Sequence, residues 1–547
     1  MEQVGAIATG HEASARAGAE VLADGGNAVD AAVAAAFAAC HCEPTLTGPG
    51  GAGFATVHQP NGDDHTFDFF TSVPGIDGTV EVAGQLVPVD VLFGATTQTF
   101  HVGPMSVAVP GFVKGVLHVH GRFGSLPLAR VLEPAIRIAR EGIQIPASQA
   151  YAHHLLTPIL TRTAAGRAIF APRGPMLVAG DRFSQPDLAD MLELLAAEGE
   201  AAFYRGDIAR EIAQWSADNG GLITRADLEQ YQVVEREPVR GTWRGFEFVT
   251  PPPPSSGGAL IAYTLQVLQR ANGGIDGPPI DVESPDGVQQ LVAALIAANG
   301  IRGSEFDGWL YGAGLVPWLL SEDVYGRGAA LHAAAHDLAP PAPSSRLGST
   351  THLSVIDSRG GAVSMTTTTG CGSGEFVGRT GIHLNNMMGE EDLLPVEHVL
   401  SPGERLTSMM SPSIVIAGGQ PILVTGSAGS SRLRGAIVQT LLRVLESRLI
   451  PGSASLTLQQ RLDAAVQAPR VHAEAGVVQV EPGYPAAAVA RLEELGHELN
   501  RWPNTNMYFG GSNMVAVDGD GSFAAAGDHR RGGGSFVAFS DGSVRPA

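Results

Sequence analysis

The interpretation of this chain starts from one stretch in its middle, Gly348-Ser349-Thr350-Thr351-His352-Leu353-Ser354-Val355-Ile356-Asp357. Small residues lead into a run whose side chains alternate between two faces, as they do along a β-strand. A glycine-containing loop at residues 358–361 separates this run from a second β-rich run at residues 362–369. Two such runs around a short loop predict a β-hairpin.

A hydroxyl residue stands where the first of these strands begins. If the chain were cut between Ser349 and Thr350, the new α-amine of Thr350 would lie beside its own Oγ. A reference α-amine has a pKa of about 8, so it can accept a proton near neutral pH. One residue would then supply both nucleophile and general base. A Thr-Thr pair entering a strand is also ordinary in β-sheets, so the pattern alone leaves both interpretations open.

The composition is that of an acidic globular chain. With 44% hydrophobic residues among 547, the sequence can bury a large core and is not disordered. A net charge of -21 argues against the basic face that a nucleic-acid-binding protein needs. No apolar run is long enough to cross a membrane, and no secretory signal is visible. We expect a cytoplasmic protein without nucleic-acid or membrane partners.

The three cysteines, Cys40, Cys42 and Cys371, are too few and too scattered for a disulfide framework. Cys40-His41-Cys42 is not spaced like the ligands of a closed zinc site, whose paired cysteines stand further apart. We therefore expect these residues to be buried as small hydrophobic side chains. The sequence predicts no metal and no other cofactor.

The first part of the chain has mainly helical patterns. Residues 14–42 predict two helices around a turn at residues 24–27, and the second helix is apolar on all sides and therefore buried. Residues 48–54 match G-x-G-x-x-G, but a helix precedes them and a strand follows, which argues against a dinucleotide site. Residues 105–345 are mainly helical, interrupted at residues 251–258 by a predicted polyproline connector with a flexible end.

Residues 339–348 are predicted to be an exposed linker, which would give access to a cut before Thr350. Beyond it, two further hairpins turn at residues 417–420 and 518–521, and helices are predicted at residues 433–447 and 485–495. Hairpins that form sheets, with helices to cover them, favour an α+β layered fold.

From about residue 5 to residue 527 the chain resembles the gamma-glutamyltransferase family of the N-terminal-nucleophile hydrolase superfamily. Nine markers occur in the order that the family has. They are Gly25-Gly26-Asn27-Ala28-Val29-Asp30-Ala31-Ala32, Glu43-Pro44, Gly50-Gly51-Ala52-Gly53-Phe54, Val109-Pro110-Gly111, Pro253-Pro254-Ser255-Ser256-Gly257-Gly258, Ser349-Thr350-Thr351-His352, Gly381-Ile382-His383-Leu384-Asn385-Asn386, Met410-Ser411-Pro412 and Gly426-Ser427-Ala428-Gly429-Ser430-Ser431-Arg432.

The resemblance implies a four-layer αββα sandwich, made as one inactive precursor that cuts itself before a nucleophilic threonine. Mapped onto this chain, the cleavage site is Ser349–Thr350. Residues 1–349 and 350–547 would then stay associated as a heterodimer of the two fragments. The implied route is attack of Thr350 Oγ on the Ser349 carbonyl, followed by hydrolysis of the resulting ester.

The resemblance also implies the catalytic residues. Thr350 would attack the substrate carbonyl while its own amine manages the proton. Thr368 matches the threonine that hydrogen-bonds the nucleophile, although a threonine in this run is equally an ordinary strand residue. Gly429 and Ser430 match the paired glycines whose backbone N–H groups form the oxyanion hole. The serine at position 430 keeps that donor, because the donor belongs to the backbone.

The implied substrate residues depart from the family pattern. Thr407 and Ser408 match the Ser-Ser pair that contacts the substrate carboxylate. Phe70, however, stands where the family has the arginine that binds the glutamyl α-carboxylate, and a ring cannot replace a bidentate contact. Glu390 replaces the aspartate that pairs with the substrate amine, and Met387 replaces a glutamine. We therefore expect the nucleophile to be intact, and we expect some of the contacts that bind the carboxylate and amine of a glutamyl group to be missing.

We expect a self-processing threonine hydrolase or acyltransferase that acts on a small molecule, either a gamma-glutamyl compound or another amide. One alternative is a homologue in natural-product biosynthesis that cleaves a carbon–carbon bond of a proline-derivative intermediate, as some members of the family do in antibiotic pathways. A second alternative is an inactive homologue that acts as a binding or scaffold protein. The intact Ser349-Thr350 junction and Thr368 argue against this last hypothesis.

Overall fold

The computed structural model describes residues 2–79, 84–93, 96–334, 349–395, 398–430, 432–447, 449–450, 455–474 and 476–547. The predicted linker at residues 339–348 lies outside these ranges, as does Ser431 of the last family marker. The statements that follow concern the described residues.

Thr351–Asp357 of the stretch quoted first form β11, a strand in the middle of an eight-stranded sheet. Its order is β25-β24-β1-β11-β12-β2-β3-β8, and every neighbouring pair is antiparallel. The bounds are Val544–Pro546 (β25), Gly534–Phe539 (β24), Gln3–Thr9 (β1), Thr351–Asp357 (β11), Ala362–Thr368 (β12), Ala52–His58 (β2), Asp64–Phe69 (β3) and Val234–Arg236 (β8). The predicted hairpin is β11–β12, and its register pairs Thr351 with Thr367.

A second sheet has six strands in the order β23-β22-β16-β15-β10-β9. They are Phe523–Ala526 (β23), Met514–Val517 (β22), Gln420–Thr425 (β16), Ser413–Ala417 (β15), Phe246–Thr250 (β10) and Val239–Trp243 (β9). Apolar side chains of both sheets, among them Ala6, Ile356 and Ile414, form one buried cluster between them. The two sheets therefore pack face to face.

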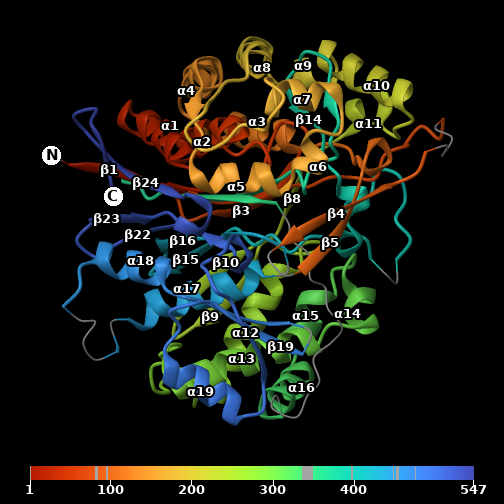
Figure 1. The fold of residues 1–547 in the computed structure, drawn as a ribbon. Helices are drawn as coiled ribbons and strands as arrows, with labels where there is room; N and C mark the ends of the chain where they lie inside the picture. The colour runs from red at the N-terminus through yellow and green to blue at the C-terminus, as the bar shows by residue number, and fades with distance from the viewer. Residues whose placement is uncertain are drawn as a thin grey trace.

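Helices cover the outer faces of both sheets (Figure 1). On the eight-stranded sheet lie α1 (Glu12–Ala23), α2 (Ala28–Cys42) and α3 (Phe112–Phe123), while α4 (Leu128–Glu141) packs on α2 and α8 (Pro186–Glu198) packs on α4. On the six-stranded sheet lie α12 (Gly257–Ala271) and α18 (Leu458–Gln467), with α17 (Leu433–Glu446) packed against both, while α13 (Pro285–Gly300) packs on α12 and α19 (Ala486–Glu494) packs on α13. The prediction of a chain that mixes helices and sheets is confirmed.

The alternation read from the sequence of β11 is present in the structure. Leu353 and Val355 pack into the cluster beneath the helices, while Ile356 points into the cluster between the sheets. Helix α2 is buried along its whole length, as predicted, and Asn27 and Asp30 form a capping box at its start. Because β11 is covered on both faces, its alternating side chains enter two different apolar clusters, one beneath the helices and one between the sheets.

The remaining elements surround these layers. Further strands are β4 (Val87–Phe93), β5 (Thr96–Val102), β6 (Ile143–Gln144), β7 (Arg182–Phe183), β13 (Phe376–Val377), β14 (Ile382–His383), β17 (Ser427–Ala428), β18 (Val471–Glu474), β19 (Val477–Val480), β20 (Glu498–Arg501) and β21 (Gly511–Ser512). Further helices are α5 (Ala147–Leu155), α6 (Thr157–Leu160), α7 (Ala164–Phe170), α9 (Glu200–Tyr204), α10 (Asp207–Asn219), α11 (Arg225–Gln230), α14 (Ser304–Trp309), α15 (Leu315–Leu319) and α16 (Glu322–Ala333). Short 3₁₀ helices are η1 (Pro104–Ser106), η2 (Met387–Gly389), η3 (Glu391–Leu393), η4 (Met507–Phe509) and η5 (His529–Arg531).

The proline-rich segment at residues 251–258 differs from its prediction. Ser255 and Ser256 are buried, and α12 begins directly at Gly257. Ser255 Oγ donates to the Met410 carbonyl (2.6 Å), and the Ser256 N–H donates to the Ser408 carbonyl (2.8 Å). The prediction of a flexible end is therefore wrong, because hydrogen bonds across the fold fix this segment.

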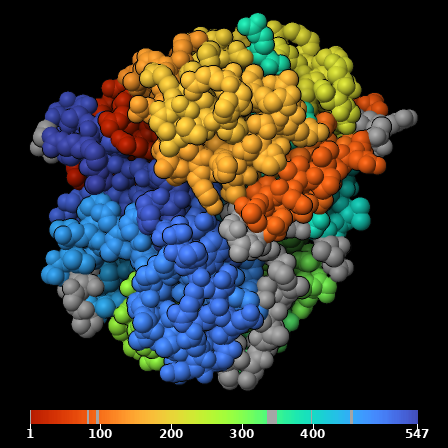
Figure 2. Space-filling model, viewed as in Figure 1, coloured from red at the N-terminus to blue at the C-terminus, as the bar shows by residue number. Residues whose placement is uncertain are grey.

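Both predicted fragments contribute to each sheet. In the eight-stranded sheet, β1 of residues 1–349 lies between β24 and β11 of residues 350–547. In the space-filling view, the orange and yellow surface of the first half meets the blue surface of the C-terminal part along one face (Figure 2). The division at Ser349–Thr350 stays a prediction, and it would not correspond to two separate domains.

Candidate active site

A small pocket, with a cavity volume of about 40 Å³, lies between the start of β11, the end of β12 and the segment after β17. It brings together seven of the residues predicted from the sequence. Its lining is Phe70, Thr350, Thr368, Met387, Glu390, Asp392, Leu393, Ser408, Met409, Met410, Gly429, Ser430 and Leu433. Ser349 and Thr407, also predicted, are outside this lining.

The hydroxyl groups of two threonines lie at the predicted cleavage site. Thr350 is buried immediately before β11, and its Oγ1 donates to the Gly429 carbonyl oxygen at 3.1 Å. Thr368 Oγ1 donates to the Ser349 carbonyl oxygen and accepts from the Gly370 N–H at 2.9 Å. The antiparallel register of β11 with β12 causes this placement, because it puts residue 368 beside residue 350. Thr368 is thus a hydrogen-bond donor on the carbonyl that a cut would attack.

Gly429 and Ser430 enter the pocket from a short strand. Strand β17 pairs with β21, and the chain then turns at Gly429, whose φ of 134° lies in a region that glycine adopts readily. Helix α17 begins three residues after Ser430, so its positive N-terminal end is directed toward this part of the site. Ser430 Oγ donates to Asp392 Oδ2 at 3.1 Å. The arrangement suits an anion, and the oxyanion role of the two N–H groups stays a prediction.

One wall of the pocket is apolar. Phe70 is only 1% exposed and stacks on Phe54 with their ring centroids 5.5 Å apart. Met387 and Met410 belong to the same buried cluster as Phe70. None of the described lining residues is basic. Where the resemblance expects an arginine, the pocket wall therefore has the aromatic ring of Phe70.

A buried carboxylate that the sequence analysis missed holds this wall in place. Asp68 Oδ1 accepts from the Phe70 N–H at 2.9 Å, and Oδ2 pairs with Arg236 at 2.8 Å. Arg405 lies 3.3 Å from the same carboxylate and 4.5 Å over the Tyr231 ring. Asp68 thereby links the end of β3 to the chain segment that carries Thr407 and Ser408. A charged residue at the end of an alternating strand was its only signal in the sequence.

The structure separates the predicted Thr407 and Ser408 pair. Ser408 lines the pocket, and its Oγ accepts from the Met410 N–H at 3.0 Å. Thr407 is buried, and its hydroxyl group donates to the main-chain carbonyl of Asp392 at 3.4 Å. Glu390 lines the opposite side, where a Cβ on Gly370 would lie 2.4 Å from its Oε1. Only Ser408 of the pair is placed to contact a ligand in the pocket.

Ionisable groups are buried directly behind Thr350. Thr351 Oγ1 donates to Glu43 Oε2 at 2.8 Å, and burial raises the pKa of Glu43 to about 7 against the opposing effects of Thr351 and Arg531. Arg531 donates to the Thr350 carbonyl at 3.3 Å. Burial lowers the pKa of His352 to about 3, so this ring is neutral at ordinary pH. Sequence reasoning noted Glu43 only as a family marker and did not find Arg531.

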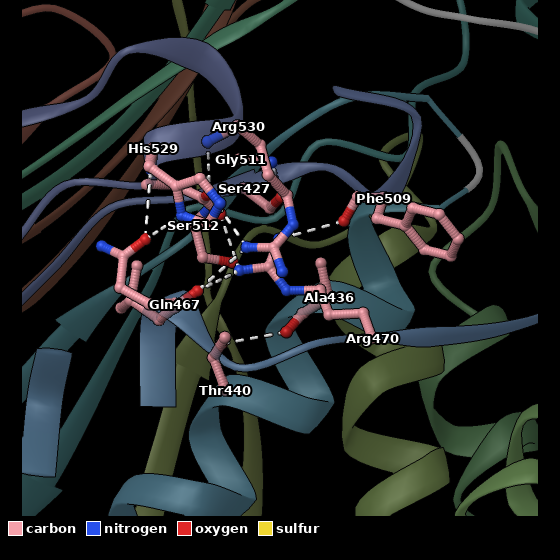
Figure 3. A network of polar contacts seen from close by, with 12 residues as sticks. Ser427, Ala436, Thr440, Gln467, Arg470, Phe509, Gly511, Ser512, His529 and Arg530 are labelled. Carbon is pink, nitrogen blue, oxygen red and sulfur yellow. Dashed lines mark hydrogen bonds and ion pairs between the residues drawn. The ribbon is translucent and has the colours of Figure 1, made fainter. Parts of the chain in front are cut away.

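A network of buried ion pairs supports this side of the site, and Figure 3 shows the polar contacts around two of its members, Arg470 and Arg530. Asp528 accepts from Arg470 at 2.6 Å and from the Ser512 N–H of β21 at 2.8 Å. Arg530 pairs with Glu481 at 2.6 Å, and Arg470 also donates to the Phe509 carbonyl at 3.0 Å. Because β21 pairs with β17, the network fixes the strand that leads to Gly429.

Cys40, His41 and Cys42 are buried in α2, as predicted. Within the described ranges, no group of three or more histidine, cysteine, aspartate or glutamate residues could hold a metal ion. None of the helices in the described part of the chain is long and apolar enough to cross a bilayer.

Two packed sheets with a threonine at the start of a central strand are the arrangement expected of an N-terminal-nucleophile hydrolase, and the comparisons with known proteins place the chain in that class. Residues 14–538 match the gamma-glutamyltranspeptidase family, and the chain belongs to that family. It is 33% identical to the acylase ACY 1 proenzyme of Pseudomonas sp. (strain V22), over 99% of this chain and 94% of that protein. It is 31% identical to the glutathione hydrolase proenzyme of Escherichia coli (strain K12), over 96% of this chain and 90% of that protein.

Among solved structures, the chain is similar to the cephalosporin acylase from Bacillus halodurans, with a TM-score of 0.78 and 25% sequence identity. The similarity covers 97% of this chain and 95% of that one. The chain is therefore an enzyme of the gamma-glutamyltransferase type, a self-processing hydrolase or transferase. The earlier hypothesis of an inactive scaffold protein is set aside.

Proposed function

We propose that this enzyme cuts itself between Ser349 and Thr350 and then uses Thr350 to cleave amides whose acyl group is largely apolar. We propose that it does so in the four-layer αββα arrangement of its superfamily. The observation that carries the choice of substrate is Phe70, buried in the pocket wall where an α-carboxylate would need an arginine.

The contacts at the junction support the self-cleavage. In the proposed step, Thr350 Oγ attacks the Ser349 carbonyl carbon, and the hydroxyl group of Thr368 stabilises the charge that develops on the carbonyl oxygen. The peptide nitrogen of Thr350 takes a proton and leaves as an amine, so that an ester joins Ser349 to Thr350 Oγ. Water then hydrolyses the ester and releases Thr350 as a new N-terminus.

In the proposed catalytic cycle, the free amine of Thr350 takes the proton from its own Oγ as the oxygen attacks the substrate carbonyl. The backbone N–H groups of Gly429 and Ser430 bind the oxyanion of the tetrahedral intermediate. The amine then gives the proton to the leaving group, and water or an acceptor amine takes the acyl group from Thr350.

The pocket lining supports an apolar acyl group. Phe70, Met387 and Met410 all line the pocket and belong to one buried cluster, and methionine side chains adapt to different apolar ligands. Glu390 and Asp392 also line the pocket, but none of the described lining residues is a cation that could pair with a substrate carboxylate. The relatives named as acylases agree with an acyl group other than gamma-glutamyl.

The experiment compares two anilides of equal acyl chain length. Mass spectrometry first establishes whether the purified protein is two chains that meet at Ser349 and Thr350. The release of nitroaniline is then measured for pentanoyl-nitroanilide, which lacks the α-carboxylate and amine, and for gamma-glutamyl-nitroanilide. We expect kcat/KM to be about tenfold higher or more for the pentanoyl compound, which corresponds to roughly 1.4 kcal/mol. A preference for the gamma-glutamyl compound would overturn the proposal.

A further inference from the structure

Two buried ionisable side chains flank the nucleophile, and the catalytic cycle described above leaves both without a role. We propose that Glu43 and Arg531 are positioning residues that hold the peptide unit between Thr350 and Thr351 and set the basicity of the Thr350 α-amine. The inference rests on the proposed function, because this amine exists only once the chain is cut before Thr350.

The two side chains hold the first two residues of the small fragment from opposite sides. Thr351 Oγ1 donates to Glu43 Oε2 at 2.8 Å. Arg531 Nη1 donates to the Thr350 carbonyl oxygen at 3.3 Å, and its Nη2 donates to the Met507 carbonyl oxygen at 3.2 Å. The amine nitrogen is separated from that carbonyl carbon by Cα alone, so the guanidinium lies within roughly 7 Å of it.

Neighbouring glycines leave room for both side chains. A Cβ on Gly10 would lie 2.2 Å from Glu43 Oε2, and a Cβ on Gly511 would lie 2.5 Å from Arg531 Cδ. Glu43 is also the C-cap residue of α2, while Arg531 ends η5 directly after Arg530 of the ion-pair network (Figure 3). The two charges are therefore placed by the ends of rigid elements.

The charges act on the amine in opposite directions. A guanidinium disfavours a nearby ammonium, so Arg531 favours the free amine, which is the form that can act as a base. The Glu43 carboxylate offsets this effect when it is ionised. Burial raises the pKa of Glu43 to about 7, so the offset is lost as the pH falls below neutrality. Burial lowers the pKa of Arg531 only to about 10, so the guanidinium stays charged in this range.

The other charged residues near the amine are unchanged in the variants of Glu43 and Arg531. Glu390 and Asp392 line the pocket together with Thr350. Asp528 and Arg432 both act electrostatically on Arg531. Because Asp528 remains beside Arg531 when Glu43 is neutralised, we expect Glu43→Gln to fold and to be cut. The glutamine oxygen also keeps an acceptor for the hydroxyl group of Thr351.

The test measures the basicity of the amine without any substrate. Mass spectrometry first checks that each protein consists of two chains. Cyanate, which reacts with free amines, is then added at a series of pH values, and carbamylation of the N-terminus at Thr350 is quantified by mass spectrometry. The acidic limb of kcat/KM on the preferred anilide gives a second measure of the same titration.

We expect Arg531→Gln to move the midpoint of cyanate reactivity to higher pH by about one unit, because a nearby positive charge has been removed. Arg531→Lys keeps the charge and is expected to stay within about 0.3 unit of the wild type. Glu43→Gln leaves Arg531 unopposed and is expected to move the midpoint to lower pH by less than about one unit. Opposite shifts in the two neutral variants distinguish an electrostatic role from general loosening of the site.

The inference is overturned if Arg531→Gln is cut but keeps the wild-type midpoint. It is also overturned if the midpoint for Glu43→Gln is unchanged or higher, or if that variant fails to fold or to be cut. Should Arg531→Gln stay uncut, the direction of the Glu43→Gln shift decides alone. A wild-type chain that stays uncut contradicts the proposed function instead, so the two failures are distinguishable.

Discussion

The two sides of the pocket are built in different ways. On the nucleophile side, the hydroxyl groups of Thr350 and Thr368 bond to the main-chain carbonyls of Gly429 and Ser349, which lie directly after β17 and shortly before β11. On the acyl side, Asp68 holds the main chain at Phe70, but the side chains of Phe70 and its methionine neighbours make only apolar packing contacts. Hydrogen bonds to the backbone specify position and chemistry together, while packing specifies only shape. A change of acyl group can therefore arise on one side and leave the nucleophile as it was.

The largest effect is expected from removing the hydroxyl group that starts the reaction. Thr350→Ala should remain one chain of 56.6 kDa, because no nucleophile is left to attack Ser349. Amide cleavage should fall below about one-thousandth of the wild-type rate. Thr350→Ser keeps a hydroxyl group and is the matched control, which we expect to mature into two chains. Mass spectrometry and the anilide assay check both variants, and an active Thr350→Ala protein would contradict the mechanism.

The acyl wall is tested by Phe70→Arg, with Phe70→Leu as the apolar control. An arginine at this position can bind an α-carboxylate through two parallel hydrogen bonds and would face the acidic side of the pocket. We expect the ratio of kcat/KM for gamma-glutamyl-nitroanilide to that for pentanoyl-nitroanilide to rise about tenfold. Phe70→Leu should leave that ratio within about threefold of the wild type. A folded Phe70→Arg protein with an unchanged ratio would mean that the carboxylate is bound elsewhere.

A stability effect is expected where the acyl wall is anchored. Asp68→Asn leaves Arg405 and Arg236 without their shared carboxylate and should lower the free energy of unfolding by about 3 kcal/mol. Glu20→Gln, which breaks an exposed pair with Arg137, is the control and should cost less than about 1 kcal/mol. Both are measured by urea unfolding in the uncut Thr350→Ala protein, so that unfolding involves one chain. Equal losses in the two variants would show that Asp68 is not a structural anchor.

The ion-pair network predicts a specific acid sensitivity. Burial alone would raise the pKa of Asp528, but Arg470 and Arg530 outweigh it and lower that pKa to about 2 from the ordinary 3.8. A lowered pKa stabilises the fold above about pH 4, and this contribution of about 2 kcal/mol is lost as the pH falls toward 2. In the uncut protein, Asp528→Asn should flatten the loss of unfolding free energy between about pH 4 and pH 2. If the unfolding free energy of Asp528→Asn fell with pH as steeply as that of the unsubstituted protein, the acid sensitivity would come from other carboxylates.

The smallest effect is expected at Ser430. Its predicted donor is the backbone N–H, and its side chain bonds only to Asp392 among the described contacts of that hydroxyl group. Ser430→Gly should therefore keep kcat/KM within about threefold of the wild type. Ser430→Pro removes the N–H and serves as the contrast, because it should abolish the oxyanion contribution of this residue. A large loss in the glycine variant would assign a role to the hydroxyl group.

Elements with a local pattern could be predicted from the sequence. The β11–β12 hairpin follows from alternation around a short loop, and its register alone brings Thr368 to Thr350. Strand β1 was missed, because its small residues lie between β24 and β11 and depend on partners from the other end of the chain. The flexible end assigned to residues 251–258 was wrong for the same reason, since its anchors are Ser408 and Met410.

The same distinction applies to the site. The hairpin stretch supplied Thr350, and the family resemblance supplied Phe70 and Gly429. Glu43 and Arg531 act through contacts with residues more than a hundred positions away, and no local pattern marks either of them. In the sequence, Asp68 looks like an ordinary strand residue, and only the folded structure shows its ion pair with Arg405. Long-range polar contacts of this kind become visible only in three dimensions.

The interleaved strands of the large sheet have a consequence for the proposed maturation. Strand β1 lies between two strands that a cut would assign to the other polypeptide, and β2 follows directly after β12. If the chain is cut as proposed, the sheet has to assemble before scission, because the contact of Thr368 with the Ser349 carbonyl, which the proposed step uses, exists only in the folded chain. After the proposed cut, no peptide bond links the two fragments. Refolding of the denatured mature enzyme would therefore require the two fragments to meet by diffusion. The lifetime of the active enzyme would then depend on its unfolding rate rather than on its equilibrium free energy of unfolding.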